Sequence, residues 1–137
     1  MNIQESKATS PEQAIEIYPD EKSKETAEIM RRFNDVFLRH DPSALKQLVA
    51  ENCVIEKIVP TPDGDRCVGD NACIALWRGI ATEPGTHFDL EEVFAAGDRA
   101  IIRWRYWSGD GRSTRGINLM RVSGGRIVEA MGYVKGA

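Results

Sequence analysis

Residues 33–57, FNDVFLRHDPSALKQLVAENCVIEK, carry the pattern that decides the fold. Apolar residues at helical spacing predict one buried face of an amphipathic helix over residues 21–39: Ile29, Phe33, Val36 and Phe37. Asp41 is a favourable N-cap and Pro42 a favourable first helical residue, so a second, short helix is expected over residues 42–50. Because the link between these two helices is so short, we expect them to form a bent pair.

The rest of the chain predicts one more helix and a set of strands. A β-branched run ended by Pro60 predicts a strand over residues 53–59, and Asp70 can cap a helix over residues 71–80. Four further segments, separated by short breaks rich in Gly, Asp and Ser, predict an antiparallel meander: residues 87–95, 99–107, 115–122 and 126–134. Helices packed on one face of a curved antiparallel sheet make an α+β architecture.

Length and composition indicate a single globular domain. The chain has 137 residues, of which 42% are hydrophobic and 28% are charged. The first part is polar and contains Pro11 and Pro19, so residues 1–20 are expected to form a flexible tail and residues 21–137 the domain. A net charge of -3 argues against nucleic-acid binding, and no apolar run is long enough for a membrane span.

The cysteines and the first residues indicate a compartment. Cys53, Cys67 and Cys73 show no paired spacing, which is unlike a disulfide framework and fits a reducing environment. The stretch MNIQESKATS lacks the apolar segment of a signal peptide, so a cytoplasmic location is expected. The sequence contains no Cys or His spacing typical of a metal site, and we expect neither a metal nor a cofactor.

The element order and several positions resemble the SnoaL-like group of the nuclear transport factor 2-like (NTF2-like) superfamily. Asp41 stands where the family has a helix-breaking Asp, LVAENCVIE is similar to the entry into its first strand, Gly69 precedes the third helix, and GGRIVEAMGYV is similar to its last strand. The resemblance covers about residues 25–135. It implies a cone-shaped α+β fold, a pocket between the helices and the concave sheet face, and homodimers formed through the outer sheet face.

The superfamily holds isomerases, cyclases, dehydratases, epoxide hydrolases and non-catalytic binding domains, so the resemblance leaves the activity open. Ketosteroid isomerase allows a comparison of chemistry. Alignment without gaps through LVAEN places Phe33 at its tyrosine donor and Lys57 at its aspartate base, and Asn118 stands at its second donor. Phe33 cannot donate a hydrogen bond and Lys57 is not a carboxylate, whereas Asn118 can donate through its amide. Ketosteroid isomerisation by that mechanism is therefore not expected, and Phe33 and Lys57 are assigned to ligand binding.

Asn118 and Glu56 are the residues expected to carry chemistry. Asn118 is a lone amide in the apolar segment RGINLMRV, so it must find hydrogen-bond partners in the fold or face a ligand. Strand alternation places Glu56 and Lys57 on opposite faces, so one of them faces the pocket. If Glu56 does, its carboxyl could act as acid or base while Asn118 donates to a developing oxyanion.

Arg103 and Arg105 leave two alternatives open. They share one face of the segment AIIRWRYW, and Trp104 and Tyr106 share the other. The family register turns the arginines toward the cavity, where they could clamp an anion, whereas hydrophobicity turns Trp104 and Tyr106 inward. Outward arginines would pair with acidic residues across the sheet or at a dimer interface.

Trp77 and Tyr133 are the remaining candidates for ligand binding. Trp77 either packs in the core or stacks on a ligand, and Tyr133 either points into the cavity or covers a dimer interface. Together the observations predict a small-molecule enzyme that uses acid–base chemistry without a cofactor in a largely apolar pocket. The alternative is a non-catalytic, dimeric binding module of the same fold. The expected partners are a small organic ligand and a second copy of the chain, with neither nucleic acid nor a membrane.

Overall fold

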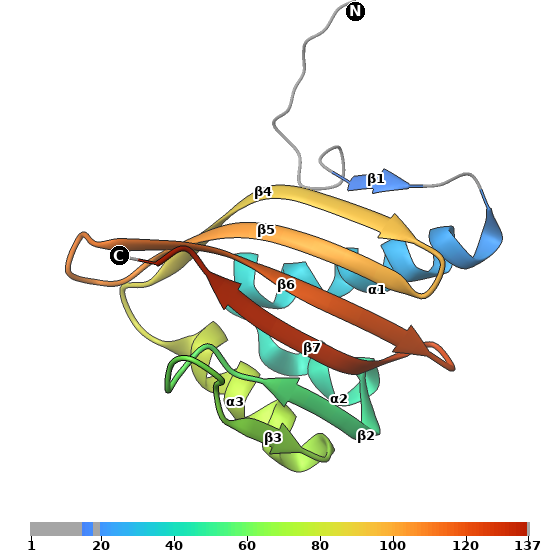
Figure 1. The fold of residues 1–137 in the computed structure, drawn as a ribbon, viewed down its shortest axis with the longest axis horizontal. Coiled ribbons are helices and arrows are strands. Elements are labelled where there is room, and N and C mark those ends of the chain that lie inside the picture. Colours follow the sequence, from blue (N-terminus) through green and yellow to red (C-terminus); the bar gives the residue numbers. More distant parts are fainter. Residues whose placement is uncertain (1–14, 18–19, 137) are drawn as a thin grey trace, which may run out of the picture.

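The computed structural model describes residues 15–17 and 20–136 and has the predicted α+β architecture, with helices packed on one side of a curved sheet (Figure 1). The helices are α1 (Glu21–Leu38), α2 (Leu45–Leu48) and α3 (Asp70–Thr82), and a 3-10 helix, η3 (Pro42–Ala44), precedes α2. The strands are β1 (Ile15–Ile17), β2 (Val49–Glu56), β3 (Arg66–Val68), β4 (His87–Ala96), β5 (Arg99–Trp107), β6 (Ser113–Ser123) and β7 (Arg126–Val134).

The sheet has seven strands in the order β1-β4-β5-β6-β7-β2-β3. Strands β4 to β7 form the predicted antiparallel meander. The sheet as a whole is mixed rather than antiparallel, because β2 runs parallel to β7 and β1 runs parallel to β4. From β2 the chain continues through β3 and α3 and then enters β4, which lies toward the opposite end of the strand order (Figure 1).

Two buried hydroxyls fix the start of α1 on the sheet. Asp20 caps the helix by accepting a hydrogen bond from the Ser23 amide at 2.7 Å. The hydroxyl of Thr26 donates to the Gly97 carbonyl at 2.6 Å, and the Gly97 amide donates to the Ser23 hydroxyl at 2.7 Å. Since Gly97 lies in the β4–β5 turn, these two bonds set how α1 crosses the concave face of the sheet.

The structure differs from the sequence expectations at several boundaries. The second helix is a 3-10 turn followed by a single α-turn, and the first strand begins at Val49 instead of residue 53. Helix α3 begins at Asp70 after Gly69, whose φ of 94° is a conformation that glycine adopts easily. The sequence does not predict strand β3, because it lies in a segment rich in turn residues. In the structure it pairs antiparallel with β2.

The N-terminal segment also contains a strand that the composition does not predict. Residues 15–17 of the expected tail form β1 and pair in parallel with β4. The rest of the tail expectation, at residues 1–14 and 18–19, lies outside the described residues. A short apolar stretch gains order here by completing the backbone hydrogen bonds of an edge strand.

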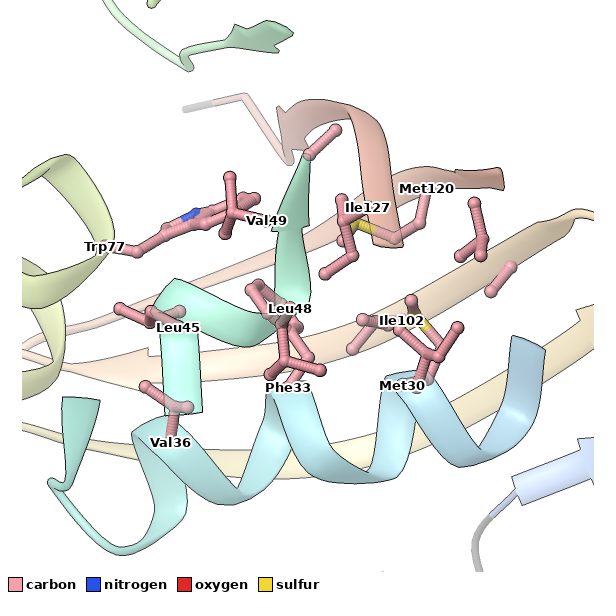
Figure 2. Packing of buried hydrophobic residues seen from close by; sticks show 14 of the residues in the cluster. Met30, Phe33, Val36, Leu45, Leu48, Val49, Trp77, Ile102, Met120 and Ile127 are labelled. Atoms are coloured by element: carbon pink, nitrogen blue, oxygen red, sulfur yellow. The ribbon is translucent and has the colours of Figure 1, made fainter. Parts of the chain in front are cut away.

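The core fills the space between the helices and the concave sheet face. Figure 2 shows Met30 and Phe33 of α1, Leu45 and Leu48 of α2, and Trp77 of α3 pointing into one cluster. On β5, Ile102 and Trp104 are 2% and 8% exposed, so the face that they share is the inner one. Of the two alternatives for β5, the structure therefore has the one that hydrophobicity favoured: Trp104 faces inward, and the arginines do not face the cavity as the family register implied.

Candidate functional site

A cavity of about 460 Å³ opens between α1, α3 and the concave face of the sheet. Its walls are mainly apolar and aromatic, with Phe33 and Phe37 from α1, Trp77 from α3, and Phe88 and Trp104 from the sheet. The predicted binding residues Phe33 and Trp77 therefore both line the cavity. They are also 2% and 4% exposed members of the core, so each combines the two roles that the sequence offered for Trp77.

The aromatic side chains form a connected wall. The Phe33 ring packs edge-on against Trp77, with centroids 4.7 Å apart, and against Phe37, with centroids 5.0 Å apart. Phe88 packs edge-on against both Phe37 and Trp104, in each case with centroids 5.7 Å apart. Edge-to-face packing of this kind holds rings in fixed positions, so the cavity is shaped before a ligand arrives.

Asn118 faces this cavity from β6, and one of its neighbours fixes its orientation. The indole N–H of Trp104 donates a hydrogen bond to Oδ1 of Asn118 at 3.1 Å. Because an indole nitrogen can only donate, the amide oxygen must face Trp104 and Nδ2 must point elsewhere. Nδ2 has no hydrogen-bond partner among the described residues and is not sealed from solvent. Asn118 therefore presents a free N–H donor in the cavity.

Asn34 is a second amide in the wall, and sequence reasoning missed it. It lies on α1 beside Phe33, lines the cavity and is 5% exposed. Its Nδ2 is fully buried and has no hydrogen-bond partner in the part of the chain that the structure describes. The available signal was its place on the apolar face of the predicted helix, one turn after Met30 and one turn before Leu38.

Glu56 and Lys57 lie at the rim where β2 ends, and both contribute to the lining. Ile55 is buried, so alternation turns the Glu56 side chain to the opposite face of β2. There the guanidinium of Arg66 donates to the Glu56 carboxylate at 3.3 Å. Lys57 has no acidic partner within ion-pair distance among the described residues. Of the two charged residues in the lining, Glu56 is thus paired with Arg66 and Lys57 is without an acidic partner.

Three other predicted binding residues lie away from the cavity lining. Arg103 extends from the outer face of the sheet and donates to Glu92 at 2.8 Å, and Arg105 donates to Ser113 at 2.7 Å. Tyr133 is 52% exposed on the outer face of β7. Of the alternatives that the sequence left open for these residues, the structure has the outward one: strand alternation turns the three side chains away from the cavity when their neighbours turn inward.

The three cysteines are free, and two of them are part of the core. Burial raises the pKa of the Cys53 thiol far above its usual range, and burial also raises the pKa of the Cys73 thiol. The Cys73 thiol donates to the carbonyls of Cys53 and Cys67, at 3.5 Å in each case. Protonated, buried thiols of this kind act as small apolar side chains. Within the described residues, no group of three His, Cys, Asp or Glu side chains is placed to hold a metal ion.

Comparison with known proteins identifies the family. The SnoaL-like domain matches residues 30–130. The chain belongs to the SnoaL-like domain family. An NTF2-like protein of unknown function from Mesorhizobium loti is 68% identical, and the match covers 88% of this chain and 99% of that one with a TM-score of 0.87. Comparison with curated proteins gives no match.

Two more distant structures share the fold of this SnoaL-like domain. A steroid delta-isomerase from Pseudomonas aeruginosa is 20% identical, with 82% of this chain and 80% of that chain covered and a TM-score of 0.68. An LEH-like epoxide hydrolase from Mycobacterium tuberculosis is 16% identical, with 82% and 80% covered and a TM-score of 0.66. At these identities the likeness confirms the NTF2-like fold alone. Among the helices that the structure describes, none is both long and apolar enough to cross a membrane.

Proposed function

We propose that this SnoaL-like domain binds a small, largely apolar organic molecule, one oxygen of which accepts a hydrogen bond from Nδ2 of Asn118. The observation that carries the proposal is the hydrogen bond from Trp104 to Oδ1 of Asn118, because it holds the amide with its donor toward the cavity. A donor that is held in one orientation in an apolar cavity, with no partner in the fold, gains a hydrogen bond when a ligand acceptor binds. A carbonyl oxygen fits this donor.

The cavity itself supports a ligand of this class. Its volume of about 460 Å³ lies within the range of small-molecule sites, and its aromatic walls suit a flat or ring-shaped apolar body. The fold is shared with a steroid delta-isomerase and an epoxide hydrolase, which supports a small organic ligand. The ligand of this chain is defined here only by its size, its apolar body and its acceptor oxygen.

The test compares two probes of the same shape, 2-acetylnaphthalene and 2-isopropenylnaphthalene, in which a CH₂ group replaces the carbonyl oxygen. Calorimetric titration should show that the wild-type chain prefers the ketone by about five- to tenfold. Asn118→Leu should remove that preference while keeping the affinity for the hydrocarbon.

A matched control is Asn52→Leu, since Asn52 is exposed and does not line the cavity. This variant should keep the wild-type preference for the ketone. The proposal fails if neither probe binds, or if Asn118→Leu keeps the preference for the ketone.

Catalysis is a second candidate function, and two titratable side chains favour it. Lys57 and Tyr106 line the same cavity as Asn118, so a group that can move a proton and a group that can stabilise an oxyanion share one space. With Glu56 turned toward Arg66, we reassign the acid–base role from Glu56 to Lys57 or Tyr106. The reaction that we propose is of the isomerase or epoxide hydrolase type, as in the two proteins of similar fold, and it requires no cofactor.

An epoxide tests this candidate directly. Incubation with 2-(naphthalen-2-yl)oxirane would yield the corresponding diol by addition of one water molecule across the ring. The wild-type chain should form diol faster than buffer, and Lys57→Met or Tyr106→Phe should lower the rate. Lys135→Met, a change at an exposed lysine outside the lining, should not. Rates equal to buffer would leave ligand binding as the function.

We also propose a homodimer formed through the outer face of the sheet. Ile101 and Tyr133 are large apolar residues that remain 38% and 52% exposed on this face. Ion pairs surround them, including Arg103 with Glu92 at 2.8 Å, and such a mixture is typical of a protein–protein interface.

Sedimentation velocity should show a dimer at micromolar concentration, and Ile101→Glu should shift it to monomer. Val68→Glu, at an exposed apolar residue on the edge strand β3, should leave the dimer intact. A wild-type chain that sediments as a monomer would contradict the proposal.

A further inference from the structure

Asn34 differs from the other buried polar residues of the described chain. The others are Ser23, Thr26 and Thr86, and each of their hydroxyls has a hydrogen-bond partner in the fold. Asn34 is equally buried, at 5% exposure, yet its Nδ2 has none. Its Oδ1 also has no hydrogen bond among the described residues, and it is not sealed from solvent. The whole amide is thus left without partners from the fold.

The position of this amide makes the lack of partners costly. Asn34 is on α1, where Asn is a weaker helix former than Leu or Met, and it lies on the buried side. Its neighbour Phe33 packs against Trp77 and Phe37, so the surroundings are aromatic. A hydrogen bond formed in such surroundings is strong, and a missing one costs about 1–3 kcal/mol. An apolar residue at this position would pack without that cost.

Asn34 lines the same cavity as Asn118, but from the opposite wall. Asn34 belongs to the helical layer and Asn118 to the concave face of the sheet, so a ligand between the two layers can reach both. The two amides offer different chemistry. Trp104 holds Asn118 so that only its donor is free, whereas the Asn34 amide has both a donor and an acceptor to satisfy.

We infer that Asn34 is a second ligand-binding residue and that it recognises a hydroxyl group, so the ligand is an apolar carbonyl compound that also carries a hydroxyl at its helix-facing end. Oδ1 is the atom of the Asn34 amide that is not sealed, and because it accepts hydrogen bonds its partner must donate: a hydroxyl can donate to it, whereas a second carbonyl could only accept. Rotation of the amide about its last side-chain bond lets either atom face the hydroxyl. This inference rests on the proposed binding of a carbonyl oxygen by Asn118.

The experiment adds a hydroxyl to the probe that already fits Asn118. Calorimetric titration against the full chain compares 2-acetylnaphthalene with three isomeric derivatives of it, which carry a hydroxyl on ring carbon 5, 6 or 7. At least one isomer should bind about five- to tenfold more tightly than the parent ketone. Asn34→Leu should abolish this gain and keep the affinity for the parent ketone within about twofold.

The same variants supply a second readout and a control. Removing an unpaired buried amide should leave the melting temperature of empty Asn34→Leu equal to or above that of the wild type. Asn34→Ala repeats the binding test with a smaller side chain if Leu disturbs the packing. Asn52→Leu, at an exposed amide, should keep the full gain from the hydroxyl.

The outcomes separate this inference from the proposed function. If the parent ketone binds and no hydroxylated isomer binds more tightly, Asn34 does not recognise a hydroxyl and the carbonyl site at Asn118 still stands. A gain that survives both Asn34→Leu and Asn34→Ala also overturns the inference. If neither the ketone nor its hydroxylated isomers bind, both the proposed function and the inference fail.

Discussion

Trp104 and Asn118 lie on adjacent strands, and the indole N–H of Trp104 donates to the amide oxygen of Asn118 at 3.1 Å. Asn118→Leu removes that acceptor, so it should lower the free energy of unfolding by about 1–3 kcal/mol. The double variant with Trp104→Phe should lose less than the sum of the two single variants, with a coupling of about 1 kcal/mol. Urea unfolding measures all three changes. If Asn118→Leu is as stable as the wild type, the bond contributes nothing to the fold and the amide serves a ligand alone.

Local patterns predicted most of the elements that surround the site. The spacing of Phe33, Val36 and Phe37 predicted α1, and the Gly- and Asp-rich breaks predicted the meander of β4 to β7. Each of these patterns is formed by residues that are close to one another in the sequence. By contrast, the parallel pairing of β2 with β7 joins distant segments, and no local pattern encodes it. The pairing of β1 with β4 escaped prediction for the same reason.

The site was predicted less well because its orientation depends on the whole sheet. Bulky residues occupy both faces of β5. Alternation therefore placed Arg103 and Arg105 on the same face, but it did not reveal that Trp104 faces inward. Once Trp104 is inside, its indole reaches Asn118, a contact between strands that sequence spacing cannot show. Asn34 was missed because periodicity identifies a buried helix face but not an amide left unpaired on it.

The contacts of Gly97 with α1 predict a measurable contribution to stability. Thr26→Val leaves the Gly97 carbonyl without its hydrogen bond in a partly buried site, so it should cost about 1–3 kcal/mol in urea unfolding. Thr82→Val is the matched control, since the Thr82 hydroxyl donates to the Arg78 carbonyl within α3 in an exposed position. This control should change stability by less than about 0.5 kcal/mol. Equal effects at the two sites would show that the Gly97 contact does not fix α1.

The buried thiols predict how stability depends on alkaline pH. Burial raises the pKa of the Cys53 thiol in the folded chain, so the folded state holds this proton more strongly than the unfolded state. The resulting stability is fully present below the unfolded thiol pKa of about 8.5 and is lost as pH rises above it. Wild-type unfolding free energy should therefore fall between about pH 8.5 and about pH 10.5. Cys53→Ala should show a shallower fall over the same range. A fall of equal steepness in both proteins would contradict the assignment.

Gly116 leaves room for the Trp104 ring, which donates to Asn118. It lies opposite Trp104 on β6, and a Cβ at this position would overlap the Tyr133 carbonyl and lie 2.7 Å from the Trp104 ring. Gly116→Ala must therefore displace Trp104 or the backbone of β7, which should cost about 1–3 kcal/mol and weaken ketone binding.

A helical glycine elsewhere supplies the control for this change. Gly79 is in α3 with open space around its Cβ direction, so Gly79→Ala should stabilise the chain by about 0.5–1 kcal/mol and leave binding unchanged. Urea unfolding and calorimetric titration of 2-acetylnaphthalene measure both effects in both variants. If Gly116→Ala keeps wild-type stability and wild-type preference for the ketone, the donor that binds the ketone does not depend on where Trp104 lies, and the orientation of Asn118 must have another cause.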